Sequence, residues 1–323
     1  MFSAIGQYYR VYAGSGNYDV ATLNLATKGG PQTWDFANGP TNIIYRYDYV
    51  GTNDGGVAAD FPLASMVERQ TSESSGLVKG RLFLRQTPGK GRINYGFYTP
   101  DEQLPEGQFN PPITDFPDPL TYQGSWSLTT SFPSTIDALG TAVDIVINYT
   151  ATATVDAYGT VILPGLGPVD CLRVNEQDQQ DTQIDDGSGT LTNVETDYIH
   201  IYYFLSPGRG IVAEVHSQQS TAGAPPDNFT TAAQFTRLFD FNRAVPTQGP
   251  SPVTDLELTR AGTSFVLNWS KPANTASFRV EYTANPAGTN AWQILTTTTK
   301  VLAIDASPDL TQPRFYRVVS LGE

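Results

Sequence analysis

The chain of 323 residues contains little cysteine, little histidine and few basic side chains, and each shortage excludes a class of protein. Its single cysteine, Cys171, excludes an internal disulfide framework and any metal site built from several thiolates. Cys171 lies in the strand-like segment Val169–Val174, so we expect a small buried core residue. Only 19 basic residues oppose 32 acidic ones, which gives a net charge of −13. An acidic protein repels phosphate groups, so we expect no nucleic-acid partner.

Long hydrophobic runs are also missing. No stretch of about 18 apolar residues occurs, so we expect no insertion into a membrane. The segment Met1-Phe2-Ser3-Ala4 lacks the charged and apolar regions of a signal peptide. If the protein is exported, the sequence is that of the mature form, and we expect a secreted, extracellular or cell-surface location.

What the chain has is strand and turn chemistry. Tyr, Phe and Thr are abundant, and 29 Gly and 23 Pro punctuate the sequence at short intervals. Alternation with a period of two recurs throughout, most clearly over Val143–Val155, which a turn at Ala157–Gly159 returns through Thr160–Leu163. Only Thr230–Phe241 is compatible with a short helix. The predicted fold class is all-β.

Two further segment pairs are predicted to form hairpins, each around a Pro-Gly turn. These hairpins join Arg81–Gln86 to Arg92–Thr99 and Tyr198–Leu205 to Ile211–Gln218.

Two proline-rich segments mark expected boundaries. Thr99–Pro119 holds six prolines and is predicted to be a long loop or a crossing between two sub-sheets. A stiff linker is predicted over residues 246–252. We therefore expect an acidic β-sandwich body over residues 1–245, formed as one sandwich or as two with a boundary near 100–119, and a separate domain over residues 253–323.

The C-terminal domain shows six alternating segments, as expected for a sandwich. They are Asp255–Leu258, Ser264–Trp269, Phe278–Tyr282, Ala291–Leu295, Val301–Ile304 and Phe315–Val319. With Leu256 and Trp269 at core positions, Val280-Glu281-Tyr282 in a strand and Leu310 before Tyr316, this part resembles fibronectin type III domains. The resemblance implies an immunoglobulin-like fold.

That family ends with a seventh strand beside the strand of Tyr316, and no such strand is evident here. The sheet edge at Tyr316 and Val318 is then covered by the body, by a short tail or by solvent, or it recruits a strand from another subunit. The second alternative predicts protein self-assembly into oligomers or filaments by strand complementation, and a surface partner or a glycan is the other expected kind of partner. The segment containing Tyr8, Tyr9 and Val11 is the predicted donor strand.

The body is similar, in short phrases only, to uncharacterised secreted or surface proteins of bacteria. These phrases are Asp118–Trp126, Tyr158–Pro164 with Leu172–Val174, and Tyr202–Gly208. The similarity implies no activity.

Metal sites are considered at two places. His200 and His216 face each other if the third hairpin is centred on Gly208, and Glu214 would supply a third ligand. The polar segment Asn175–Gly189 is predicted to be an acidic loop, in which a loose calcium site is the alternative to simple solvation. Its candidate ligands are Asp181, Asp185 and Asp186, with Asp178 beside them.

Catalysis would need paired carboxylates, since no nucleophile motif or phosphate loop occurs. An acidic cluster lies in the proline-rich segment with Phe109 and Phe116, a composition found both in glycosidases and in ordinary binding loops. Its members are Asp101, Glu102, Glu106, Asp115 and Asp118. The sequence thus predicts a non-catalytic surface or adhesion protein, with a secreted glycan-binding or glycan-hydrolysing enzyme carrying an accessory module as the alternative.

Overall fold

The computed structural model describes residues 4–99, 106–138, 141–185, 189–242, 253–272, 275, 277–286, 292–306 and 308–321. The chain divides into two compact units, Met1–Arg243 and Ala244–Glu323, each with its own core. Both units are built from strands, with two short 3-10 turns, η1 (Ala21–Leu23) and η2 (Ala58–Asp60), in the first. The predicted all-β class is confirmed.

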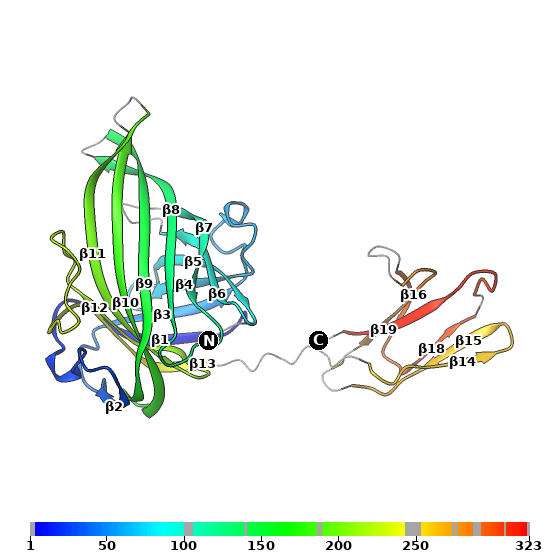
Figure 1. Cartoon of the computed structure of the whole chain (residues 1–323). Coiled ribbons are helices and arrows are strands. Elements are labelled where there is room, and N and C mark those ends of the chain that lie inside the picture. The colour runs from blue at the N-terminus through cyan, green and yellow to red at the C-terminus, as the bar shows by residue number, and fades with distance from the viewer. Residues whose placement is uncertain are drawn as a thin grey trace. The chain divides into compact units, whose positions relative to one another are not determined.

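The strands of unit 1 form one large sheet, in which β2 (Gly29–Asp35) is parallel to its neighbour. The other twelve strands are antiparallel and close into a barrel (Figure 1). In spatial order its strands are β10 (Gly167–Asp185), β11 (Leu191–Ser206), β12 (Gly210–Ser217), β13 (Thr231–Asn242), β1 (Tyr8–Asp19), β3 (Ile43–Val50), β4 (Met66–Ser72), β5 (Val78–Thr87), β6 (Gly91–Tyr98), β7 (Glu106–Phe116), β8 (Ser125–Ala138) and β9 (Thr141–Leu163). Pairing of β9 with β10 completes the circle.

The predicted sandwich body is therefore wrong in its architecture. Strands that alternate apolar and polar residues can line either the gap between two sheets or the inside of a barrel. The choice depends on which distant strands pair. Here β1 pairs with β13 from the end of the unit, so the first strand joins the last and a single sheet closes.

The hairpin predicted between Val143–Val155 and Thr160–Leu163 is wrong, because both segments lie in the single strand β9. Strand β9 runs unbroken for 23 residues to Leu163, and the turn that follows it leads into β10. Gly159, predicted to lie in a turn, continues the strand at φ +159°. At this point β2 lies parallel to β9 and its backbone approaches Gly159 closely. The glycine allows this approach and does not reverse the chain.

The structure also contradicts the predictions for two other segments. The proline-rich segment contains β7, which lies between β6 and β8. Because Pro111 and Pro112 have no N–H to donate, the ladder is irregular there, and β7 pairs with β8 only at Asn110 opposite Ser131 among the described residues. The helix considered at Thr230–Phe241 is strand β13, paired on both sides. The other two predicted hairpins, β5–β6 and β11–β12, are confirmed.

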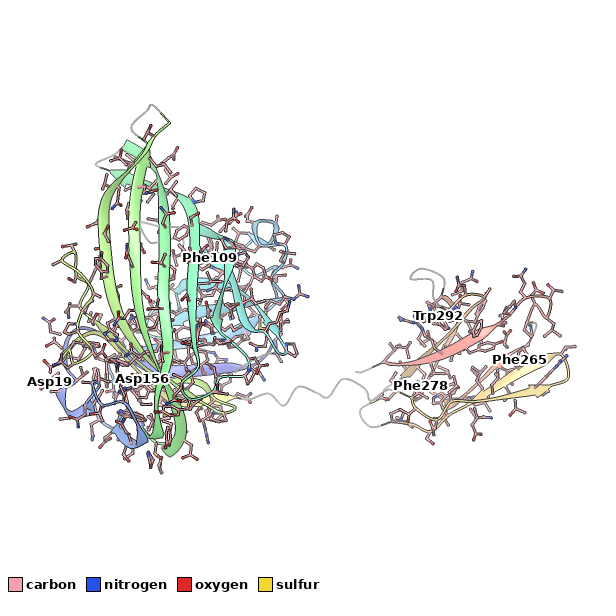
Figure 2. All side chains as sticks on the ribbon, viewed as in Figure 1. Asp19, Phe109, Asp156, Phe265, Phe278 and Trp292 are labelled. Carbon is pink, nitrogen blue, oxygen red and sulfur yellow. The ribbon has the colours of Figure 1, made fainter. Side chains whose placement is uncertain are left out.

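A second layer covers part of the outer face of the barrel. Trp34 and Phe36 pack edge-on against Phe204, and all three are buried. Arg173 is fully buried beneath this layer and donates two hydrogen bonds of 2.9 Å to Asp156, which is labelled in Figure 2. The two buried charges neutralise each other, because a single unpaired charge in this closely packed layer would be costly.

Unit 2 consists of two three-stranded sheets that share one core. One sheet has the order β14 (Glu257–Ala261), β15 (Ser264–Asn268), β18 (Leu302–Asp305), and the other β17 (Gln293–Thr298), β16 (Ser277–Thr283), β19 (Phe315–Leu321). Trp269 and Phe278 meet edge-on in the core, where Phe278, labelled in Figure 2, is fully buried.

Among the described residues, no helix has the length and apolar character needed to cross a membrane.

The close approach of β2 to β9 predicts the cost of a side chain at Gly159. The Cβ of a Gly159→Ala variant would lie 2.0 Å from the backbone oxygen of Gln32, which cannot yield without moving the strand. We expect a loss of about 1–3 kcal/mol in the free energy of unfolding, measured by urea denaturation. Gly51→Ala is the control, because its Cβ would meet nothing within 4 Å. Equal stability of the two variants would contradict this account of the approach.

Candidate functional site

The interior of the barrel holds a cavity of about 520 Å³. Its wall combines aromatic rings, aliphatic side chains, amides and carboxylates from strands all around the barrel. The side chains central to the argument are Tyr9, Tyr47, Glu68, Arg92, Asn94, Asp115, Tyr149, Glu176, Gln180, Tyr203 and Glu214. A cavity of this size and mixed lining is typical of a small-molecule site.

Strand geometry determines which residues reach the cavity. Side chains alternate between the two faces of a strand, so Glu176, Asp178 and Gln180 of β10 share the inner face, and of these three Glu176 and Gln180 line the cavity. Directly opposite Gln180 on β9 lies Tyr149, and opposite Glu176 on β11 lies Ile201. In Figure 1 strands β9, β10 and β11 form a tall wall, which carries this polar face.

The opposite side of the cavity has an arginine at its centre. Arg92 donates a hydrogen bond of 2.9 Å to Asp115 and one of 3.3 Å to Glu68. Burial opposes its charge, but Glu68 and Asp115 together raise the pKa of Arg92 well above its usual value. Tyr49 donates a short hydrogen bond to Glu68. Both carboxylates on this side therefore have a permanent cationic partner.

The Glu176–Asp178 pair has a different environment. Both side chains are at least nine-tenths buried, with exposures of 4% and 8%. Burial, and then the nearby charge of Asp178, raises the pKa of Glu176 well above its usual value. Burial likewise raises the pKa of Asp178 to about 6, against the effects of Tyr149 and His216. Among the described residues, neither carboxylate forms an ion pair with Lys or Arg.

The two-histidine metal site is wrong. His216 lies opposite Ile201 and not opposite His200, so the two imidazoles are on different faces of the sheet. His200 is buried outside the barrel, where Nε2 lies 2.8 Å from Oδ1 of Asn175. His216 lies on the inner face, 3.7 Å from a carboxylate oxygen of Glu214. A shift of one residue in the hairpin separates the predicted ligands.

The predicted calcium ligands do not lie in a loop. Residues 175–185 belong to strand β10, which pairs with β9 and β11 along this stretch. Asp181 accepts hydrogen bonds from Gln179 and from Thr196, the latter at 2.7 Å. Asp185 ends the strand, and Asp186 lies outside the described residues. The part of the chain that the structure describes holds no group of three or more potential metal ligands.

The residues predicted for assembly occupy two different positions. Tyr8, Tyr9 and Val11 lie in β1, which pairs with β13 on one side and β3 on the other. Donation of this segment would require β1 to leave the barrel. Tyr316 and Val318 lie in β19, which pairs with β16 alone among the described strands.

The acidic cluster of the proline-rich segment is dispersed. Asp101 and Glu102 lie outside the described residues. Asp118 accepts a hydrogen bond from the backbone of Gly89, whereas Asp115 lies inside the barrel with Arg92. Phe109, labelled in Figure 2, lines the cavity.

Sequence reasoning did not identify Glu176, Tyr149 and Tyr203 as site residues. The polar run around Glu176 predicts a loop, although Tyr149 and Tyr203 both lie in predicted strands. The feature of the sequence that indicates the site is the long stretch of alternating apolar and polar residues in β9. A strand of that length needs an equally long partner, which is β10.

Comparison of the chain with protein-family models, with curated proteins and with solved structures gave no match. The functional argument therefore depends on the geometry and electrostatics of the cavity.

The raised pKa of Asp178 predicts how stability changes with pH. An acid whose pKa rises on folding binds its proton more tightly in the folded state, so stability falls as the pH rises from about 4 through about 6. In Asp178→Asn this ionisation is absent. We expect the fall in unfolding free energy between about pH 4 and pH 7 to shrink by up to about 3 kcal/mol.

The measurement is urea denaturation across this pH range. Asp170→Asn is the matched control, since Asp170 lies on the same strand and is exposed. A wild-type pH profile unchanged by Asp178→Asn would show that Asp178 is not the group that titrates.

Proposed function

We propose that unit 1 is a non-catalytic binding protein whose barrel encloses a small molecule. The observation that carries this proposal is the internal cavity of about 520 Å³ with its mixed aromatic and polar lining. Rings such as Tyr9, Tyr47 and Phe109 offer flat apolar surfaces, while Gln180 and Asn94 offer hydrogen bonds. A ligand with an apolar or ring-shaped body and polar groups at its edge fits this wall, and small saccharides belong to that class.

The carboxylate geometry favours binding over glycan hydrolysis. Hydrolysis of a glycosidic bond needs two carboxyl groups that flank the bond, at least about 5 Å apart. Glu176 and Asp178 are two residues apart on one face of β10 and interact directly with each other. Of the other acids of the wall, Glu68 and Asp115 are engaged by Arg92, and Glu214 lies 3.7 Å from His216. The proposal is accordingly a binding site and not an active site.

For unit 2 the proposal is a fibronectin type III-like module, and for the whole protein an extracellular or cell-surface location. Two three-stranded sheets around Trp269 and Phe278 support the module, since this family buries a Trp between two sheets. The location depends on the resemblance of unit 2 to modules of secreted proteins.

Self-assembly is a second proposal and depends on a separate observation. Strand β19 has a hydrogen-bonded neighbour on one side only among the described strands, so its other backbone edge is available to a strand from a second copy. Tyr316 and Val318 lie on this strand.

The binding proposal predicts the effect of filling the cavity. Gln180→Trp places a large ring on the inner face of β10, and we expect it to abolish ligand binding. Gln177→Trp is the control, because Gln177 is exposed on the outer face of the same strand. Isothermal titration calorimetry with neutral mono- and disaccharides, neutral phenols and amines measures the effect. Equal loss in both variants, or no binding to the wild type from the whole panel, would refute a site in the barrel.

The assembly proposal predicts that the full chain forms oligomers, as measured by sedimentation velocity over a range of concentrations. A chain that ends at Arg243 lacks β19 and should sediment as a monomer. If the full chain is monomeric at every concentration, the edge of β19 does not recruit a second copy.

A further inference from the structure

We propose that the cavity binds an organic ammonium ion, whose positive charge is held by Glu176 and Asp178. The inference rests on the binding function proposed above and specifies the chemistry of the ligand.

The first argument is an unused acceptor inside the barrel. Asp178 is 8% exposed and interacts with Tyr149 and Glu176, yet its Oδ1 accepts no hydrogen bond from any described residue. Asp197 lies opposite Gln180 on the same inner face, is 7% exposed and also has an unpaired Oδ1. Buried carboxylate oxygens without partners are costly, and a donor supplied by a ligand would remove that cost.

The second argument is the contrast with the other buried acids. Glu68 and Asp115 are paired with Arg92, and Asp156 is paired with Arg173 at 2.9 Å. This protein therefore neutralises buried carboxylates with arginine where they serve the fold. For Glu176 and Asp178 no cationic side chain does so within the described residues, and the missing positive charge is the one that a ligand would bring.

The charges on neighbouring strands do not supply it either. Arg92 on β6 is engaged by two carboxylates. His216 on β12 lies beside Glu214 and also lowers the pKa of Asp178, but burial outweighs this effect. The remaining ionisable groups on the inner face near the pair are acids and tyrosines, namely Asp115 on β7, Tyr149 on β9, Asp197 and Tyr203 on β11 and Glu214 on β12. An anionic ligand would meet several like charges there, whereas a cation would meet opposite ones.

The aromatic lining selects an organic cation over a metal ion. Tyr149 interacts with Asp178, and Tyr203 interacts with Glu176, so each carboxyl group has a tyrosine beside it. Tyr9 and Tyr47 stack at 4.5 Å on another part of the wall. Rings of this kind attract ammonium groups through their faces and cover the apolar body that carries them. Three or more metal ligands do not come together among the described residues.

Binding must also release protons. Without a ligand, burial raises the pKa of both carboxyl groups and so favours their protonated forms. An ammonium ion favours the ionised carboxylates, so the proton leaves for solvent as the cation enters. Affinity for the cation is therefore expected to increase as the pH rises through about 6.

Three probes of one shape test the inference by calorimetry on the full chain. Tyramine carries an ammonium group, tyrosol has a neutral hydroxyl in its place, and phloretate has a carboxylate. We expect tyramine to bind at least about tenfold more tightly than tyrosol, and phloretate not to bind. Tyramine binding should release protons, which is measured in buffers of different ionisation enthalpy. Calcium chloride is the metal probe, and we expect no binding that depends on Asp178.

Asp178→Asn should weaken tyramine binding at least about tenfold and leave tyrosol binding unchanged, while Asp170→Asn should change neither. Tyrosol binding as tight as tyramine binding, with both lost in Gln180→Trp, would overturn the inference and leave the proposed binding function intact. Absence of tyramine binding, or calcium binding abolished by Asp178→Asn, would also overturn it. Failure of every compound in the neutral and cationic panels would refute the proposed function itself.

Discussion

The pairing of β9 with β10 is the constraint on which the structure of unit 1 depends. It joins the two ends of a twelve-stranded sheet and leaves the barrel without a free edge. Closure also separates the two faces of every strand, so each side chain lies either in the interior or on the outside. Because twelve strands enclose more volume than side chains of ordinary size fill, a cavity follows from the strand number.

In a closed barrel, every buried polar side chain needs a hydrogen-bond partner and every buried charge needs an opposite charge. An arginine supplies that charge to Glu68 and Asp115 inside the barrel, and another supplies it to Asp156 outside the barrel. Among the described residues, no arginine does so for Glu176 and Asp178. Burial raises the pKa of both, as it also does for Asp115, but they lack the arginine that Asp115 has. This chain pairs some of its buried carboxylates and leaves others unpaired. Unpaired carboxylates of this kind are typical of a binding site, where the ligand supplies the missing partner.

The sequence predicted the strands much better than their closure. Alternation located the hairpins β5–β6 and β11–β12 and the strands of unit 2, because a period of two is a local property. It could not show that β1 pairs with β13, since that contact joins distant parts of the chain. The polar residues from Asn175 to Asp185 predict a loop, because a sequence does not distinguish polar side chains that face a cavity from those that face solvent. A one-residue shift in register placed His200 and His216 on opposite faces.

If the barrel binds a cation as proposed, stability and ligand binding are coupled through the same two carboxyl groups. Near neutral pH their raised pKa values mean that ionisation costs folding free energy, which a sequence selected only for stability would avoid with Asn and Gln. A cation that binds only the folded barrel would increase the free energy of unfolding by mass action, and so would offset part of this cost. The empty barrel would then be the less stable form, and ligand concentration would control how much of the protein remains folded. Such coupling explains why an acidic pair can persist in the interior of a closed barrel without a cationic side chain beside it.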